Sequence, residues 1–600
     1  MSEVKERKEM DKAFTWDLSS LYTSDADWEK DFDEIGPKLD ACAAFKGKLD
    51  CAENIRKFYD AQFALFRKLE NILNYAMLRH SEDTRAAEAQ RMYDRAFGTY
   101  ARAMSALSFA DPEILSLPEE ELEAITADEC LKEYRFILEK LLKRKAHTLS
   151  AAEEGVIAAF REALQTPERA SSALMDADML YEPAVDSEGN THELTGSNFV
   201  LLETSSDRVL RKSAFENFYK TFKNHINTLA ATYAGNAKAD AAEAALRHYG
   251  SAREGRLAQD NIPVSVYDNL IDTVRANMDV MHRYARLRKR ILHLDELHYY
   301  DVYTPLAEGV SRHYTYDEAQ EMVLKAVAPL GENYCETVRG AFRDRWIDVY
   351  PNKGKSSGAY SSGTFDSNPY ILTNFTGTLD SVSTIAHEMG HSLHSWHTNH
   401  TQPYQYADYS LFVAEVASTV NENLLIESLL KEEKDPKTRL SLLNQYLEGF
   451  KGTVYRQTMF AEFEKITHAM AEENKALDPD TLCGIYEQLI RDYFGDALVV
   501  DDEVKYEWAR IPHFYSSFYV YVYATGYSAA VALSQKILNE GESAVKAYLE
   551  FLSMGSSRYP LDELKHAGVD LSQPAPIETA LKKFDEVLKE AEAIADELGL

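Results

Sequence analysis

Cysteine, proline and glycine are all scarce in this chain of 600 residues. The cysteines are odd in number and scattered, without a C-x-x-C pair, which argues against a disulfide framework or a thiolate metal site; they are Cys42, Cys51, Cys130, Cys335 and Cys483. We expect them to be reduced residues of the core. Because proline and glycine both interrupt helices and number only 17 and 26, their scarcity favours a helical protein.

Positive charge and long apolar runs are also lacking. Lys and Arg total 65 against 98 Asp and Glu, a formal net charge of −33, so we expect no nucleic-acid partner, which would require a basic surface. The most apolar run, residues 518–533, is broken by polar residues and is shorter than the ~18–20 apolar residues of a membrane span. The charged N-terminus lacks the apolar region of a secretory signal. We expect a soluble, cytoplasmic protein with no membrane partner and no obligate protein partner.

The remaining composition is that of a folded, mainly helical protein. Hydrophobic residues make up 45% of the chain and charged residues 27%, and 600 residues exceed what one hydrophobic core usually serves. Apolar periodicity predicts helices over residues 52–78 and 86–107, and capping boxes at Ser150 and Thr315 predict two more helix starts. A turn-forming cluster within residues 181–191 suggests a small hairpin and a break in the chain. We therefore predict an N-terminal helical lobe, residues 1–195, and a second domain, residues 196–600.

The stretch 379–394 carries the clearest chemistry, because it contains the pattern H-E-x-x-H at residues 387–391. On a helix, His387 and His391 lie one turn apart on the same face and can bind one metal ion. Glu388 between them can accept a proton from an activated water and return it to a leaving amine, which is the chemistry of peptide hydrolysis. Asp380 is a good N-cap, and apolar residues recur at helical spacing after it. The segment is therefore predicted to be a buried metal-binding helix.

A catalytic zinc ion normally has three protein ligands, so one ligand remains to be found. His394 lies seven residues from His387, ~10 Å along a helix axis, which is too far for both to bind one ion. Glu415 and Glu422 lie on the next predicted helix, residues 410–425. Glu415 sits among apolar neighbours, where a buried carboxylate needs a partner, whereas Glu422 is flanked by asparagines. We favour Glu415 as the third ligand.

Residues 351–378 differ from the helical segments around them. The part up to residue 364 is rich in Gly and Ser, and residues 370–375 favour β-structure, so two strands of a small sheet are predicted directly before the metal-binding helix. Small side chains at Gly358, Ala359 and their neighbours would let a peptide approach an edge strand closely. We expect Gly358, Ala359 and Tyr360 to contact substrate; an ordinary glycine-rich loop is the alternative.

These motifs resemble the thimet-oligopeptidase-like zinc metallopeptidases. The resemblance rests on HEMGHSLH at 387–394 and FVAEVAS at 412–418, and the flanking segments 352–360, 369–375 and 14–22 point to the oligoendopeptidase F branch. It implies a mainly α fold: a two-lobed helical ellipsoid with a deep internal channel and a small sheet beside the metal-binding helix. It also implies one Zn²⁺ held by His387, His391 and Glu415, with Glu388 as general base. A narrow channel would admit unfolded oligopeptides and exclude folded proteins.

A second segment, residues 510–527, contains five tyrosines and one histidine. Members of the family use a histidine and one or more tyrosines here to stabilise the negative charge that develops on the carbonyl oxygen. The resemblance assigns this role to His513 and, by our first choice, Tyr519. Tyr523 is the second choice and a candidate substrate contact, and Tyr515 and Tyr521 are further possibilities. The spacing fits a helix face or a strand equally well.

The sequence thus predicts a zinc-dependent endopeptidase that cleaves internal bonds of short unfolded oligopeptides. Three other interpretations were considered: a peptide-binding protein with a structural metal, a protease of folded proteins, and a metal hydrolase acting on another bond. A structural zinc site would need a fourth ligand and has no use for Glu388.

Overall fold

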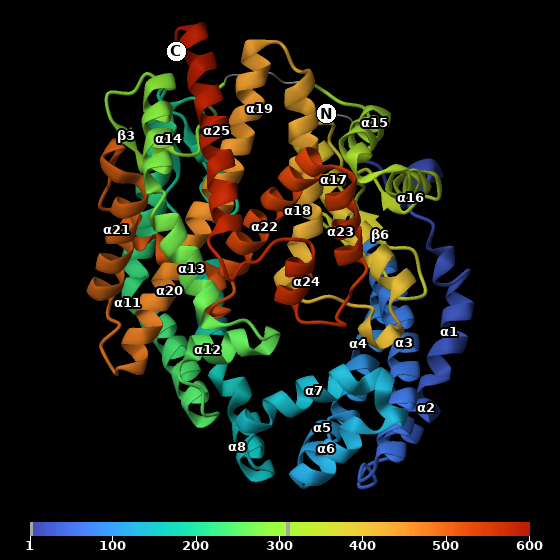
Figure 1. Ribbon diagram of the computed structural model, residues 1–600. Coiled ribbons are helices and arrows are strands. Elements are labelled where there is room, and N and C mark those ends of the chain that lie inside the picture. The colour runs from blue at the N-terminus through green and yellow to red at the C-terminus, as the bar shows by residue number, and fades with distance from the viewer. Residues whose placement is uncertain (1–3, 308–311) are drawn as a thin grey trace. The chain divides into compact units, whose positions relative to one another are not determined.

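The computed structural model describes residues 4–307 and 312–600, and almost all regular structure in it is helical (Figure 1). The strands are two or three residues long and form three small sheets. The predicted mainly α fold is therefore confirmed. Among the described residues, no helix carries an apolar stretch long enough to cross a lipid bilayer.

The chain folds into two compact units, each assembled from three separate segments. Unit 1 comprises Met1–Thr148, Ser311–Ser428 and Leu533–Gly568, and unit 2 comprises Leu149–Val310, Leu429–Ala532 and Val569–Leu600. Each unit therefore combines residues that are hundreds of positions apart in the sequence. The predicted division at residues 195 and 196 stays a prediction.

Unit 1 contains the N-terminal helices, the helices of the H-E-x-x-H region and one three-stranded sheet. Its elements are α1 (Asp25–Asp33), α2 (Ile35–Ala43), α3 (Ala52–Glu82), α4 (Ala87–Leu107), α5 (Ala110–Leu115), α6 (Glu119–Ala127), α7 (Arg135–Lys143), α15 (Tyr316–Val327), α16 (Glu332–Arg343), β4 (Ile347–Asp348), β5 (Tyr360–Ser362), β6 (Tyr370–Leu372), α17 (Leu379–Thr401), most of α18 (Leu411–Glu432), α23 (Glu542–Leu552) and α24 (Pro560–His566).

Unit 2 is built around the long helix α11. Its elements are α8 (Ala151–Leu164), α9 (Thr166–Ala173), β1 (Ala184–Val185), β2 (Thr191–His192), α10 (Phe199–Glu203), α11 (Arg208–Leu246), α12 (Ala252–Leu257), α13 (Val264–Arg275), α14 (Met278–Ile291), β3 (Leu297–His298), α19 (Pro436–Gly449), α20 (Arg456–Glu472), α21 (Pro479–Phe494), β7 (Leu498–Val499) and α25 (Ala575–Leu598). Helix α22 (Tyr521–Glu540) begins in unit 2 and continues into unit 1.

Local sequence signals placed several elements well. Both capping boxes are formed, by Ser150 with Glu153 at the start of α8 and by Thr315 with Glu318 at the start of α15. The turn cluster lies in the hairpin in which Ala184 pairs with His192. The cysteine prediction was wrong in part: Cys51, at the N-cap of α3, is exposed.

The sheet of unit 1 lies directly before α17 in the chain, with strand order β4-β6-β5. Strand β6 pairs in parallel with β4, Ile347 opposite Ile371, and antiparallel with β5, Ser361 opposite Ile371. Strands β5 and β6 confirm the two predicted strands. Strand β4 was missed because two residues give no detectable alternation. The side chains of Tyr370 and Leu372 on β6 join the hydrophobic core formed by the N-terminal helices.

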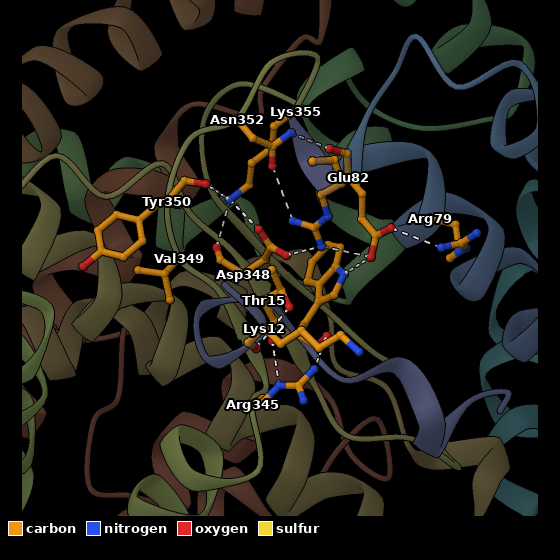
Figure 2. Close-up of polar contacts among 12 residues, drawn as sticks. Lys12, Thr15, Arg79, Glu82, Arg345, Asp348, Val349, Tyr350, Asn352 and Lys355 are labelled. Carbon is orange, nitrogen blue, oxygen red and sulfur yellow. Dashed lines mark hydrogen bonds and ion pairs between the residues drawn. The ribbon is translucent and has the colours of Figure 1, made fainter. Parts of the chain in front are cut away.

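A buried group of charges connects this sheet to the loop that leads into β5 (Figure 2). Lys355 and Asp348 form an ion pair of 2.7 Å with both side chains 1% exposed. The Lys355 ammonium group also donates to the backbone carbonyls of Asp348, Tyr350 and Thr373 at 2.6–3.1 Å. Arg7 lies 2.5 Å from the second oxygen of Asp348. Since a buried charge is stable only when paired and hydrogen-bonded, these contacts fix the loop's position on the sheet.

Candidate metal and catalytic site

Helix α17 carries the H-E-x-x-H residues and begins two residues earlier than expected. Its N-cap is Thr378, whose hydroxyl accepts a hydrogen bond from Ser381 N at 3.2 Å. Asp380 was wrongly predicted as the cap; it lies in the first turn, where a carboxylate interacts favourably with the helix dipole. Threonine and aspartate are both suitable N-cap residues. The conformation of the chain before the helix determines which of the two caps it. The apolar face that follows is completely buried, as predicted.

The two histidines point their outer nitrogens toward the same position. His387 Nε2 and His391 Nε2 are 3.2 Å apart, as expected for residues one helical turn apart with both rings on one face. The exposed fractions of the two side chains are 26% and 18%. Both rings are therefore reachable from solvent while their helix is anchored in the core.

Glu415 on α18 completes this group. Its Oε2 lies 3.4 Å from His387 Nε2 and 3.4 Å from His391 Nε2. Among residues 4–307 and 312–600, the three side chains form the group whose ligand atoms lie close enough together, within 4.8 Å, to hold a metal ion. Although burial opposes ionisation, a hydrogen bond from His391 and the nearby imidazoles lower the pKa of Glu415 to about 2. Its carboxylate is thus ionised at neutral pH, as a ligand requires.

The donor set fits zinc in type and in spacing. A tetrahedral ion with Zn–N and Zn–O bonds of ~2.0–2.1 Å holds its ligand atoms ~3.3–3.4 Å apart. The three observed separations, 3.2, 3.4 and 3.4 Å, match the edges of such a tetrahedron. Three protein ligands leave the fourth position of a tetrahedron for water or substrate, which is the pattern of a catalytic site.

The close approach of α17 and α18 depends on Gly390. A Cβ atom at this position would lie 2.5 Å from Ser418 Cα and 2.6 Å from Ala417 O, both of them backbone atoms. A glycine is therefore needed for α18 to come near enough to present Glu415. An amide hydrogen bond of 3.1 Å from Asn421 to the carbonyl of Ala386 joins the same two helices.

Glu422, the alternative to Glu415 as third ligand in the sequence analysis, lies on the other side of the His387 ring. Its Oε1 lies 3.1 Å from His387 Nδ1, the ring nitrogen that faces away from the ligand group. Burial by itself would lower the pKa of His387, but Glu422 and the neighbouring carboxylates raise it to about 9. A carboxylate in this position orients the imidazole and increases its basicity toward a metal. The seven-residue spacing from Glu415, two helical turns, is the signal that both carboxylates share one face of α18.

Glu388 is buried beside the ligand group, 6% exposed. Burial raises the pKa of its carboxyl group, and Oε2 has no hydrogen-bond partner among the described residues. A buried carboxylate with an unused acceptor is suited to take up a proton. Its role as general base stays a prediction.

His394 is separate from the ligand group, as its spacing indicated. Its ring is 1% exposed and stacks on Tyr409 with the centroids 3.7 Å apart. Burial lowers the pKa of His394 to about 3, so the ring is neutral and serves packing.

The three predicted strand contacts lie at and just before β5, the end strand of its sheet. Gly358 is exposed and has a φ of +78°, and Ala359 and Tyr360 are half-buried. Ser361 on β5 and Ser392 on α17, the residue after His391, are joined by a hydrogen bond of 2.8 Å. The Tyr360 ring packs against the N-terminal core, which leaves its backbone as the part able to contact a peptide. Only one edge of β5 is paired within the sheet.

The predicted oxyanion residues lie in unit 2 and form a small group of their own. The rings of His513 and Tyr523 are 5.9 Å apart, and those of Tyr519 and Tyr523 are 5.3 Å apart. Tyr515 shares a hydrogen bond of 2.7 Å with Thr232, and Tyr521 is 3% exposed in the core. His513 is exposed at the surface, and partial desolvation of its ring lowers its pKa. The segment is neither one helix nor a strand: a short turn at Pro512–Tyr515 precedes α22.

Two contributors to the site were missed in the sequence. Gly390 interrupts an otherwise good helix pattern, and an isolated glycine in a helix is a recognisable signal of close packing. Lys355 lies within the segment 352–360 that carried the family resemblance, but nothing in its neighbours indicated a buried ammonium group.

Comparison with known proteins agrees with the fold. The sequence pattern of peptidase family M3 matches residues 201–583, and the pattern described as Oligopeptidase F matches residues 113–181. The chain is 44% identical to Oligopeptidase PepF of Bacillus subtilis (strain 168), with 99% of this chain and 89% of the relative covered. It is 40% identical to Group B oligopeptidase PepB of Streptococcus agalactiae serotype III (strain NEM316), with 98% of both covered.

A solved structure is similar over nearly the whole chain. The crystal structure of oligoendopeptidase-F from Enterococcus faecium matches with a TM-score of 0.74 at 35% identity, covering 96% of this chain and 99% of that one.

Proposed function

This chain belongs to peptidase family M3, in its oligoendopeptidase F branch, and from that premise we propose that it is a zinc-dependent endopeptidase of short unfolded oligopeptides. Family membership itself makes the chain a metallo-endopeptidase that acts on oligopeptides. The identity of the metal, the residues that act and the restriction to short unfolded chains are the proposed part.

One observation carries the assignment of zinc: two imidazole nitrogens and one carboxylate oxygen separated by the edge lengths of a zinc tetrahedron. A zinc ion bound there would polarise the scissile carbonyl and lower the pKa of the attacking water. His387, His391 and Glu415 would hold it, and Glu422 would keep the His387 ring oriented. A structural zinc site is less well supported, because it would use a fourth protein ligand.

Glu388 acts as the general base in this proposal. Its buried carboxylate accepts a proton from the attacking water and later returns it to the nitrogen of the leaving amine. Burial raises its pKa, which makes the carboxylate a stronger base than one exposed to solvent. General acid–base catalysis of this kind contributes about 10²–10⁴-fold to the rate.

The remaining predicted residues bind and orient the peptide. The backbone of Gly358, Ala359 and Tyr360 pairs with the extended substrate, as an edge strand does in β-augmentation. His513 and Tyr519 donate hydrogen bonds to the developing oxyanion, and Tyr523, whose ring contacts both, lies against the substrate. Action in the cytoplasm, without an obligate protein partner, is part of the same proposal.

The test is cleavage of an internally quenched fluorescent oligopeptide by wild type and by Glu388→Gln, with zinc content determined on both. We expect about one zinc per chain in both proteins, and a loss of kcat of about 10²–10⁴-fold in the variant alone. Asp380→Asn, on the exposed first turn of the same helix, is the matched control and should retain full activity. Equal activity in wild type and Glu388→Gln would overturn the mechanism.

A second pair of variants tests the oxyanion residues. His513→Gln and Tyr519→Phe should lower kcat by about 10²–10³-fold while zinc content stays unchanged. Activity on a folded protein substrate comparable to that on its unfolded peptides would contradict the restriction to short unfolded chains.

A further inference from the structure

Unit 1 contains a second feature suited to bind part of a peptide: a pocket of about 580 Å³. It lies between α3, α4, the residues that follow β5 and the segment that connects α17 to α18. Six of its 18 lining residues are aromatic: Phe63, Phe66, Tyr100, Phe365, Tyr404 and Tyr409. A pocket of this size accommodates the longest amino-acid side chains.

This pocket adjoins the metal group through three elements. Ser395 and Asn399 line it from α17 and lie one and two turns after His391, ~6 and ~12 Å along the helix. Ala414 lines it from α18, next to the ligand Glu415, and Gly363 follows β5 directly. Since an extended peptide advances ~3.3 Å per residue, a side chain roughly two to four residues from the scissile bond would reach it.

Two carboxylates give the pocket its chemical character. Glu70 on α3 and Asp408 in the α17–α18 connection line it, and no Lys, Arg or His is among its lining residues. The Tyr404 hydroxyl donates to Glu70, and Tyr409 N donates to Asp408 Oδ1 at 2.8 Å. The guanidinium group of Arg67 lies over the ring of Phe365, 4.5 Å from its centroid, and is engaged by Asp366 through its Nε at 2.9 Å. The negative charge on the pocket wall is therefore not balanced by a basic side chain lining the pocket.

The environment of these carboxylates favours a cation as the ligand. Burial, with the charge of Asp408 added, raises the pKa of Glu70 to about 7, and burial also raises the pKa of Asp408. Glu70 is half-buried and Asp408 is exposed, and the raised pKa of each shows that the surroundings of both disfavour an unpaired negative charge. A cation placed between them would remove that penalty.

We propose that this pocket is a substrate subsite that binds a basic side chain, arginine in preference to lysine, a few residues from the scissile bond. The inference rests on the proposed peptidase function. Arginine is favoured because its planar guanidinium group stacks on aromatic rings and pairs with carboxylates through several donors, whereas the ammonium group of lysine is a more strongly hydrated point charge.

The test uses quenched fluorescent peptides in which one position at a time, up to four residues on each side of the scissile bond, carries arginine, lysine or citrulline. Citrulline has the shape of arginine without its charge, so the ratio of kcat/KM for arginine over citrulline isolates the electrostatic contribution. At one position we expect a ratio of about tenfold in wild type, equivalent to one ion pair of ~1.4 kcal/mol. In Glu70→Gln/Asp408→Asn the ratio should fall below about twofold at that position.

The control for net charge is Glu53→Gln. Glu53 lies on the same helix as Glu70 but is exposed, paired with Lys57, and ~25 Å away along the axis. In Glu53→Gln the ratio of kcat/KM for arginine over citrulline should equal that of wild type. An unchanged ratio in the double variant, or a wild type without any arginine preference at these positions, would overturn the proposal; the latter result does not depend on whether the variant folds.

Binding separates the failure of this subsite from the failure of the proposed function. Wild type and the double variant are titrated with reduced-amide peptides, which cannot be cleaved, carrying arginine or citrulline at the selected position. An arginine preference in Kd that disappears in the double variant supports the subsite even if Glu388→Gln proves fully active. Equal Kd values for the two peptides in wild type count against the subsite even if Glu388 is confirmed as the base.

Discussion

In the proposed metal site, Glu422 is a carboxylate outside the ligand group that should affect metal binding. Its hydrogen bond of 3.1 Å to His387 Nδ1 fixes which nitrogen of the ring faces the ligand group. We expect Glu422→Gln to weaken zinc binding by roughly 10–100-fold, since outer partners of ligating histidines have effects of this size. Competition with a calibrated chelator measures the affinity. Glu432→Gln, at the exposed end of the same helix, should bind zinc as wild type does.

Glu70 should make the arginine preference depend on pH. Its pKa of about 7 means that the carboxyl group is mostly neutral at pH 6 and mostly ionised at pH 8. The groups around it are Tyr404, Tyr100, Asp408 and Asp366; the pKa values of both tyrosines are raised, so these tyrosines remain neutral in this range. The ratio of kcat/KM for arginine over citrulline should therefore rise as pH increases from 6 to 8.

The matching variant is Glu70→Gln, in which the pH dependence of that ratio should be flat. Because arginine and citrulline peptides are compared in the same enzyme, pH effects on the catalytic residues cancel. A ratio that falls with increasing pH in wild type would contradict the assignment of Glu70.

At the level of single residues, the motif identified the proposed metal ligands, but not the residues that contact them. The i, i+4 spacing of His387 and His391 sets their geometry once the helix is accepted. Choosing Glu415 over Glu422 required the register between α17 and α18, which a contact at Gly390 determines. The local sequence does not indicate which residues of two helices will lie opposite each other. The apolar neighbours of Glu415 in the sequence were only indirect evidence for its burial, because 37% of the side chain is exposed.

Between elements, the contact at Gly390 makes a sharp prediction. In Gly390→Ala the new methyl group would overlap backbone atoms of α18, which cannot rotate away as a side chain can. Overpacking of this kind typically costs about 1–3 kcal/mol, and separation of the helices would draw Glu415 away from the histidines. We expect lower thermal stability and zinc content well below one per chain.

The matched control is Gly98→Ala on α4. This glycine is also helical and in unit 1, but a Cβ there meets nothing within 4 Å. Replacing it should raise stability by about 0.5–1 kcal/mol, through the better helix propensity of alanine. Full zinc content in Gly390→Ala would refute the role assigned to the contact.

The buried Lys355–Asp348 pair should matter far more than ion pairs on the surface. Lys355→Met leaves Asp348 in a 1% exposed position with Arg7 as its remaining cation. Breaking a buried pair typically costs about 3–5 kcal/mol. By contrast, Lys57→Met removes an ion pair whose two side chains are about half exposed, where the expected loss is below about 1 kcal/mol. Urea denaturation of both variants measures the difference. Similar losses in the free energy of unfolding would show that the buried pair contributes no more to stability than the surface pair.

Elements with strong local signals were predictable, and those fixed by tertiary contacts were not. Helix α8 begins directly after its predicted cap Ser150, and α3 begins at residue 52 as its periodicity indicated. Strand β4 has only two residues and exists because β6 pairs with it. The tyrosine segment remained ambiguous because Phe518 adopts a φ of +58°, a conformation that no sequence pattern indicates for this residue type.

For the whole molecule, the net charge of −33 predicts that association with basic peptides depends on salt. Between about 0.02 and 0.3 M salt the Debye length shrinks from roughly 20 to 6 Å, which screens long-range attraction. The value of kcat/KM for a peptide of net charge +2 should fall several-fold over this range. A neutral peptide of the same length should change little, and a parallel loss for both peptides would point to a salt effect on the enzyme itself.

The mainly α class was predictable from the amino-acid composition, whereas the grouping of chain segments into the two units was not. The scarcity of proline and glycine, together with repeated apolar stripes, indicates helices without indicating where they lie in the fold. Which helices pack together is decided by contacts such as the one between the Thr398 hydroxyl on α17 and the carbonyl of Leu552 on α23, 154 residues apart. Nothing in either segment indicates the other.

The interleaving of the two units has a consequence for synthesis on the ribosome. The proposed metal ligands are translated by residue 415, but unit 1 also needs Leu533–Gly568, and α23 from that segment is bonded to α17. A ribosomal exit tunnel that shields the last few tens of residues delays this segment further. We therefore expect nascent chains to remain inactive until Leu533–Gly568 has left the tunnel, which would spare unfinished neighbours in the same polysome from cleavage.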